Sequence, residues 1–381
     1  LDLNHNSKFL PDNFIEKHEN YLLYEGDVVI AMTDMATETK ILGLPTYFKS
    51  DGRSFLLNQR VGRLFDFDKN EIELKYLRYI LSSPDIIQYY KSFGKGALQI
   101  NLGKNDILNA IIPIPPLLEQ HAIVSKIEEL FSELDNGITQ LKTAQQQLKI
   151  YRQSLLKWAF EGKLTNKNVK DGELPTGWKW VNIIDLADKA KHSLKAGPFG
   201  SALKKEFYTK EGFKIYGQEQ VISDNAFLGE YYVNEEKYNE LKSCKVKPFD
   251  ILISLVGTVG KVLILPENCR SGIINPRLIK ITLNRNLYFP KFFKYYFESS
   301  YVKNIYKNKA QGTTMDVLNL GIIKTIPFPL CSLPEQTLIV TELESKLTVC
   351  DKIEETISQS LLQAESLRQS ILKKAFEGKL V

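Results

Sequence analysis

The chain has 381 residues and a formal net charge of +5, with hydrophobic and charged fractions of 43% and 25%. These fractions are ordinary for a globular protein, and no stretch approaches the roughly 20 apolar residues that a membrane helix needs. The cysteines lie far apart, at Cys244, Cys269, Cys331 and Cys350, which argues against structural disulfides and zinc sites. We therefore expect a cytoplasmic protein that binds no metal.

The first predicted domain covers residues 1–112. It contains the strand-like segment YEGDVVIAM at 24–32 and is slightly acidic, with 13 Lys and Arg against 15 Asp and Glu. The segment PDIIQYYK at 84–91 loosely resembles the acidic-acidic-lysine set of a nuclease, but it lacks a second carboxylate at the right position. We interpret that segment as structural.

Residues 113–166 are predicted to contain the first long helix, over 117–162. Residues 117–162 contain no proline, their single internal glycine is Gly137, and Gly162 suits the left-handed residue that ends a helix. One heptad position is apolar five times in succession, at Ile127, Leu134, Leu141, Leu148 and Leu155. This spacing predicts coiled-coil packing.

The second predicted domain covers residues 167–326 and is composed of short β-rich segments followed by an aromatic-rich helix. Between residues 174 and 326 there are 23 Lys and Arg against 14 Asp and Glu. A basic excess confined to one domain favours a polyanionic partner, although a merely solvated basic surface would give the same count. GTVGK at 257–261 is too short for a phosphate loop, and we interpret it as a hairpin turn.

The last segment, 327–381, repeats the first helix. Residues 335–381 align without a gap on residues 119–165, 216 positions earlier, and the final RQSILKKAFEGKLV differs from RQSLLKWAFEGKLT at only three positions. The second helix is predicted over 333–378, with Ser332 and Glu335 as its capping box. Weaker similarities extend the repeat upstream, between YEGDVVIAM and KPFDILISL and between LNQR (57–60) and INPR (274–277).

The chain therefore contains two copies of one unit, a domain followed by a long helix. We predict an α+β fold in which two long antiparallel coiled-coil helices, each a rod of roughly 65 Å, separate two β-rich domains related by a pseudo-two-fold axis. Two amphipathic helices on separate domain cores are the alternative. The offset places the start of the first copy about 50 residues before Leu1, so we expect part of the first domain to be missing.

Catalytic motifs are absent from the sequence. There is no phosphate loop and no glycine-rich nucleotide or methyl-donor site, and the four histidines form no cluster. Asn275-Pro276 is followed by Arg-Leu, and not by the Pro-Pro-aromatic sequence of amino-methyltransferases. We expect a chain without catalytic residues.

Two domains thus alternate with two long helices that begin with IPIPPLLEQ-like residues and end with AFEGKL, and the second domain opens with LPTGWKW. This arrangement resembles the specificity subunit of type I restriction–modification systems. The resemblance implies that each domain is a target-recognition domain reading one half of a split double-stranded DNA sequence. It also implies that two methyltransferase subunits dock on the helices and that restriction subunits join them. S-adenosylmethionine would then be bound by the methyltransferase partner, and this chain would hold no cofactor.

Polar and basic side chains in glycine-containing turns are the candidate DNA contacts, because such side chains read base edges and phosphates. In the first domain they are Thr33, Lys40, Lys95 and Gln99, and in the second Lys195, Ser201, Gln218, Thr258, Gln311, Thr313 and Thr314. Residues identical in the two helices are the candidate partner contacts, namely Arg152, Gln153, Lys157 and Phe160 with Arg368, Gln369, Lys373 and Phe376. Helix ends and contacts between the repeats would explain the same identities.

Two further classes of protein remain as alternatives. One is the DNA-recognition part of a single-chain restriction–methylation fusion, which would carry methyl-donor motifs upstream of Leu1. The other is a coiled-coil adaptor with no role on DNA.

Overall fold

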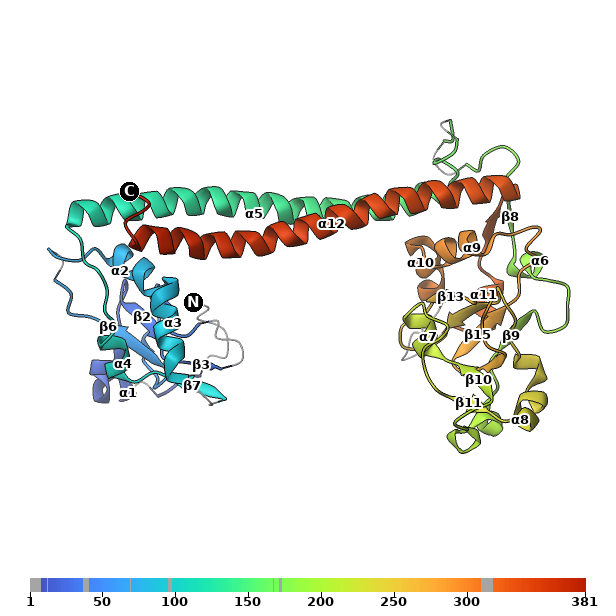
Figure 1. Cartoon of the computed structure of the whole chain (residues 1–381), viewed down its shortest axis with the longest axis horizontal. Coiled ribbons are helices and arrows are strands. Elements are labelled where there is room, and N and C mark those ends of the chain that lie inside the picture. Colours follow the sequence, from blue (N-terminus) through green and yellow to red (C-terminus); the bar gives the residue numbers. More distant parts are fainter. Residues whose placement is uncertain are drawn as a thin grey trace. The chain divides into compact units, whose positions relative to one another are not determined.

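The computed structural model describes residues 8–11, 13–36, 41–68, 70–94, 98–166, 168–170, 173–309 and 318–381. The chain forms two compact units, one of Leu1–Ala144 with Thr356–Val381 and the other of Gln145–Glu355. Each unit contains one globular domain together with a segment of each long helix, α5 (Leu117–Phe160) and α12 (Leu333–Phe376) (Figure 1). No helix in the described part of the chain combines the length and apolar character that crossing a bilayer requires.

The two predicted long helices are confirmed, and each ends two residues before the predicted position. Both ends have the same geometry, in which Gly162 and Gly378 adopt φ values of 73° and 69°. At the first end Lys163 N donates to Trp158 O at 2.8 Å, and at the second Lys379 N donates to Lys374 O at 2.9 Å. These bonds across a left-handed glycine form the Schellman motif, which satisfies carbonyls at the end of a helix.

The helices pack antiparallel within each unit. In the first unit, Ile127 near the start of α5 is buried with Ile371 and Leu372 near the end of α12. In the second unit the order is reversed, since Leu155 near the end of α5 is buried with Leu343 near the start of α12. The heptad positions predicted to be apolar therefore form the seam.

Equivalent ion pairs accompany the seam in the two units. Arg152 Nη2 lies 2.6 Å from Asp351 Oδ1 and 3.0 Å from Glu354 Oε2. Arg368 pairs with Asp135 in the same way, and its guanidinium lies over the ring of Phe131. The offset of 216 relates Arg152 to Arg368 and Asp135 to Asp351, so the duplication extends to side-chain contacts.

The first unit is built on the antiparallel sheet β4–β2–β6, with two separate ribbons, β1–β5 and β3–β7. Strand β2 is central, and its residues Val28, Val29 and Ile30 are buried. The elements are α1 (Asn13–Lys17), β1 (Leu22–Leu23), β2 (Val28–Ala31), β3 (Thr33–Met35), β4 (Pro45–Tyr47), β5 (Phe55–Leu56), β6 (Val61–Leu64), α2 (Leu74–Leu81), α3 (Pro84–Lys91), β7 (Gln99–Asn101) and α4 (Lys104–Leu108).

The second unit repeats this sheet as β13–β12–β15 and adds β9 beside β15. A further sheet, β11–β10–β14, includes the parallel pair β10–β14. The elements are β8 (Lys179–Val181), α6 (Ile183–Leu186), β9 (Leu194–Ala196), β10 (Phe213–Tyr216), α7 (Gln218–Ile222), β11 (Tyr232–Val233), α8 (Glu235–Glu240), β12 (Ile251–Ser254), β13 (Val262–Ile264), β14 (Gly272–Ile274), β15 (Leu278–Ile281), α9 (Pro290–Phe297), α10 (Ser300–Lys309), α11 (Leu320–Lys324) and β16 (Phe328–Leu330).

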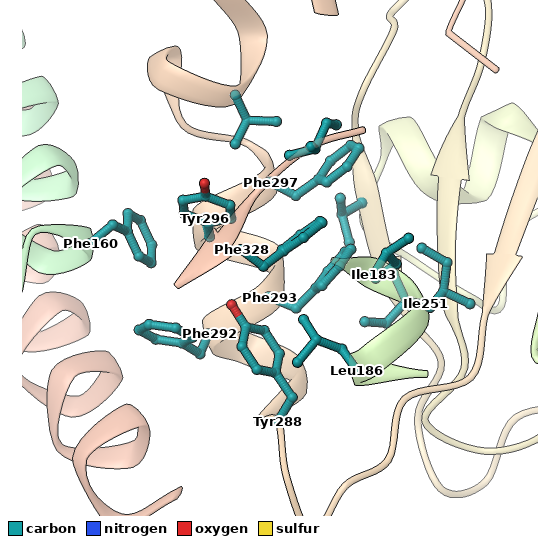
Figure 2. Close-up of a cluster of buried hydrophobic side chains, with 14 of the residues drawn as sticks. Phe160, Ile183, Leu186, Ile251, Tyr288, Phe292, Phe293, Tyr296, Phe297 and Phe328 are labelled. Carbon is teal, nitrogen blue, oxygen red and sulfur yellow. The ribbon is translucent and has the colours of Figure 1, made fainter. Parts of the chain in front are cut away.

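An aromatic cluster joins α5 to the second domain. Side chains of α9 surround Phe328 of β16, and Phe160 at the end of α5 reaches the same cluster (Figure 2). The ring of Phe160 lies 5.3 Å from that of Phe292 and 5.1 Å from that of Tyr296. In the first unit Phe376 and Tyr76 make the equivalent contact, at 5.4 Å. Each helix end is therefore anchored to a domain by edge-to-face aromatic packing.

A buried glutamine anchors the start of each long helix. Gln336 Oε1 accepts a hydrogen bond from Phe289 N at 2.8 Å, and its Nε2 donates to Leu287 O and Cys331 O. Gln120 makes the same three bonds, to Glu73 N, Glu71 O and Pro115 O. Both residues are 0% exposed, and each satisfies three backbone groups in buried or partly buried surroundings.

Two glycines, one inside α5 and one just beyond its end, are expected to respond in opposite ways to substitution by alanine. A Cβ built on Gly137 meets nothing within 4 Å outside the helix backbone, and glycine inside a helix costs about 0.5–1 kcal/mol relative to alanine. Gly137→Ala is therefore expected to raise the free energy of unfolding by about that amount, measured by urea denaturation. Gly162→Ala, with its positive φ and its Cβ 2.3 Å from Pro175 Cγ, is expected to lower it. Effects of the same sign would contradict these assignments.

Candidate nucleic-acid interface

Several turns of the second domain meet at one end of the β13–β12–β15–β9 sheet. They are the β12–β13 turn, which contains Thr258, the turn at Asn275–Arg277 before β15, and the start of α7. Gln218 connects all three, because its Nε2 donates to Val256 O and its Oε1 accepts from Arg277 Nη1 at 3.4 Å. Two candidates from the sequence, Gln218 and Thr258, thus lie in one cluster with Arg277, which sequence reasoning missed.

The turn after β9 packs directly against this cluster. Gly197 N donates to Leu278 O at 2.9 Å, and a Cβ on Gly197 would lie 1.9 Å from Asn275 O. Only glycine permits this approach of two backbones. Phe199 follows in this turn, and Ser201 lies in the short 3-10 helix Gly200–Leu203 that comes next. Both residues are exposed, Phe199 by 83%.

Gly197→Ala is expected to lower the free energy of unfolding of the second unit by about 1–3 kcal/mol, because the Asn275 backbone must shift to admit the methyl group. Urea denaturation measures this change. Gly103→Ala is the matched control, since its Cβ would meet only the Asp106 carboxylate, at 3.3 Å. Equal effects of the two substitutions would contradict the close approach at Gly197.

Aromatic side chains adjoin the cluster. The rings of Tyr208 and Tyr231 lie 5.3 Å apart, and Tyr231 is 58% exposed. Burial raises the pKa of Tyr208, as does Tyr231, and the charge of Arg277 opposes that rise. An exposed surface that combines aromatic rings, amides and a guanidinium suits contacts with nucleic acid.

The electrostatic surroundings of β9 are basic. Lys195 lies opposite Lys280 of β15 in the sheet register, and Lys195 is half-buried. The pKa of His192 is lowered, first by desolvation and then by the charges of lysines around it, which include Lys191 and Lys195. The candidate Lys195 therefore belongs to a lysine group beside the cluster rather than to the cluster itself.

In the first domain the β3–β7 ribbon gathers two of the predicted residues. Thr33 and Gln99 come from different strands, and both side chains hydrogen-bond Asn101 Oδ1, at 3.1 and 3.3 Å. Asn101 is exposed, and so are the neighbouring Met35 and Leu98. Sequence reasoning missed Asn101, although its place two residues after Gln99 in a strand puts both on one face.

Five other candidates, Lys40, Lys95, Gln311, Thr313 and Thr314, lie outside the described residues. Described residues before and after 310–317 form hydrogen bonds with the segment between β12 and β13. Leu318 N donates to Leu255 O at 3.2 Å, and Tyr306 Oη donates to Val259 O at 3.4 Å.

The candidate partner residues fall into two groups. Gln153, Lys157, Gln369 and Lys373 are exposed, whereas Arg152 and Arg368 form the ion pairs of the seam. Phe160 is only 6% exposed and Phe376 is half-buried, so these rings serve mainly the helix–domain contacts.

A groove of about 920 Å³ lies beside the end of α5 in the second unit, and Gln153, Lys157 and Phe160 line it. The lining also includes Trp180 and Tyr301, which are 47% and 51% exposed. Exposed aromatic side chains around a groove are typical of protein-binding surfaces. Within the described residues no three His, Cys, Asp or Glu side chains are placed to hold a metal ion.

Comparisons with known proteins agree with this architecture. The sequence matches the family described as the type I restriction modification DNA specificity domain over residues 4–144 and 175–363. The EcoBI specificity subunit of Escherichia coli is 24% identical over 374 residues, which are 95% of this chain and 75% of that relative. The StySPI specificity subunit of Salmonella potsdam is 28% identical over 389 residues, 98% of this chain and 78% of that protein.

A solved structure from a study of the assembly and conformational transition of the type I R-M system matches with a TM-score of 0.69 at 20% identity, covering 94% of this chain and 83% of that one. The relatives are named as specificity subunits, and neither the fusion enzyme nor the adaptor is favoured by these matches. The two matched ranges cover most of each copy of the repeated unit, and the chain belongs to the type I restriction–modification DNA specificity family.

Proposed function

We propose that this chain is the sequence-specificity subunit of a type I restriction–modification complex. Each globular domain reads one half of a bipartite DNA target, and the helix pair sets the distance between the halves. The observation that carries this proposal is the duplication itself. The same sheet, glutamine anchors and helix ends occur twice, while the polar residues at the candidate interfaces of the two domains differ.

The difference between the two exposed surfaces supports a split, asymmetric target. The first domain presents Thr33, Gln99 and Asn101 on a ribbon, whereas the second presents Gln218 and Thr258 beside aromatic rings. Domains with a shared scaffold and different polar groups read different bases. A rigid spacer between two readers then fixes the half-site separation as a geometric quantity.

The partners follow from the same proposal. Two methyltransferase subunits dock on the helix pair, where Gln153 and Lys157 and their repeats Gln369 and Lys373 offer equivalent exposed groups. Restriction subunits join that core in the cytoplasm. This chain carries no reaction of its own, and S-adenosylmethionine is held by the methyltransferase partner.

The test is to co-express the chain with its methyltransferase partner in a host without other methylation and to profile methylated bases in the genome. We expect one bipartite motif with a spacer of fixed length. Methylation that requires only a single continuous motif, or no motif, would contradict the proposal.

A further inference from the structure

Two of the nine arginines differ from the other seven in the partners of their guanidinium groups. Seven of the nine arginines lie against a carboxylate or over an aromatic ring, namely Arg53, Arg63, Arg78, Arg152, Arg270, Arg285 and Arg368. Arg60 and Arg277 are exposed, and within the described residues neither has a carboxylate or an aromatic ring in such a position. The single side-chain hydrogen bond of Arg277 among the described residues is the 3.4 Å bond to Gln218.

The two arginines occupy the same place in the repeated fold. Each ends an Asn-x-Arg turn, in which the asparagine Oδ1 accepts from the arginine N, at 2.8 Å for Asn58 and 2.9 Å for Asn275. In the first domain the carbonyl of Arg60 accepts a hydrogen bond from Met32 N, directly after β2, at 2.9 Å. In the second domain the carbonyl of Arg277 accepts one from Leu255 N, directly after β12, at 3.0 Å. The turns fix the backbone on which each guanidinium is presented.

Each turn also adjoins the candidate interface of its own domain. Met32 immediately precedes the β3–β7 ribbon, and Leu255 immediately precedes the β12–β13 turn. The carbonyl of Met32 accepts from Leu102 N at 2.7 Å, and that of Leu255 accepts from Leu318 N at 3.2 Å. The polar groups next to the two arginines differ between the domains, but the arginine and its turn do not.

We propose that Arg60 and Arg277 are equivalent phosphate contacts, one for each half of the DNA target. This inference rests on the proposed function and adds a positioning role to it. Half-sites of different sequence need different base readers, whereas their phosphates are the same, so a residue kept in both domains suits the sequence-independent contact. An exposed guanidinium without a carboxylate partner loses no ion pair when it binds phosphate.

The experiment uses the complex of the full chain with its methyltransferase partner. Binding is measured to two DNA duplexes of equal length, one carrying the motif found by methylation profiling and one lacking it. The salt concentration is varied between about 50 and 200 mM. Arg60→Ala and Arg277→Ala are each expected to weaken binding to both duplexes about tenfold, which corresponds to about 1.4 kcal/mol. Each is also expected to reduce the slope of log affinity against log salt by about 0.9, the value of one phosphate contact.

Two variants serve as matched controls. Arg285→Ala removes an equal charge from an exposed position at the other end of β15, where the guanidinium lies over Phe249, and is expected to change the slope far less. Arg277→Lys keeps the charge and is expected to keep the slope.

Unchanged affinity and slope in both alanine variants would overturn the inference. A relaxed preference at one base pair with an unchanged slope would overturn it too, in favour of base reading. If the wild-type complex did not distinguish the two duplexes, the proposed function itself would fail.

Discussion

Leu343→Asp is expected to lower the free energy of unfolding by about 4 kcal/mol or more. Leu343 is 0% exposed in the helix seam of the second unit, and truncating a buried leucine alone costs about 2–5 kcal/mol. The substitution also places a carboxyl in apolar surroundings, which adds a desolvation cost. Urea denaturation followed by circular dichroism measures the loss.

The pH dependence of this variant provides a second readout. Burial raises the pKa of the introduced carboxyl above its unfolded value of about 3.9. The folded state then binds more protons than the unfolded state, so stability falls as the pH rises from about 4 through the raised pKa. The deficit should be smaller at pH 5 than at pH 7. Leu338→Asp, at a leucine of the same helix that is 51% exposed, is the control, and equal losses in the two variants would contradict the packing.

Gln336→Ala is expected to lower the free energy of unfolding by about 3 kcal/mol or more. The substitution leaves Phe289 N, Leu287 O and Cys331 O without their partner, and each unsatisfied buried group costs about 1–3 kcal/mol. Gln120→Ala is expected to have a similar effect through the equivalent three bonds. Thermal and urea denaturation of the purified chain measure both.

Gln153→Ala is the control for this pair, because Gln153 is exposed and its loss is expected to change stability by less than about 0.5 kcal/mol. A Gln336→Ala variant as stable as the Gln153→Ala variant would show that the three bonds are not needed. A large loss for Gln336→Ala with none for Gln120→Ala would contradict the equivalence of the two anchors.

The long helices could be predicted from the sequence because their signals are local. Leu155 and the other apolar heptad residues determine the seam, and Gly162 and Gly378 determine the ends within two residues. The glutamine anchors could not be predicted, although the Glu-Gln pair is visibly repeated. The partners of Gln336 include backbone groups 47 and 49 positions away, and no local pattern specifies such contacts.

The candidate interface was only partly predictable for the same reason. The search for polar residues in predicted turns identified Thr33, Gln99, Gln218 and Thr258 as candidates. The structure places Thr33 and Gln99 in strands β3 and β7 and Gln218 at the start of α7, and the tertiary fold decides which of the candidates lie together. Asn101 and Arg277 were missed because their importance comes from neighbours distant in sequence. The similarity of LNQR to INPR was visible, yet its meaning required the two equivalent turns.

The central claim is that two homologous domains each read one half of a split target. Exchanging residues 174–326 for the corresponding domain of a relative with a different target tests it most directly, with methylated motifs profiled before and after. We expect one half-site to change to that of the donor, while the other half-site and the spacer length stay the same. A motif that changes in both halves, or in neither, would contradict the account.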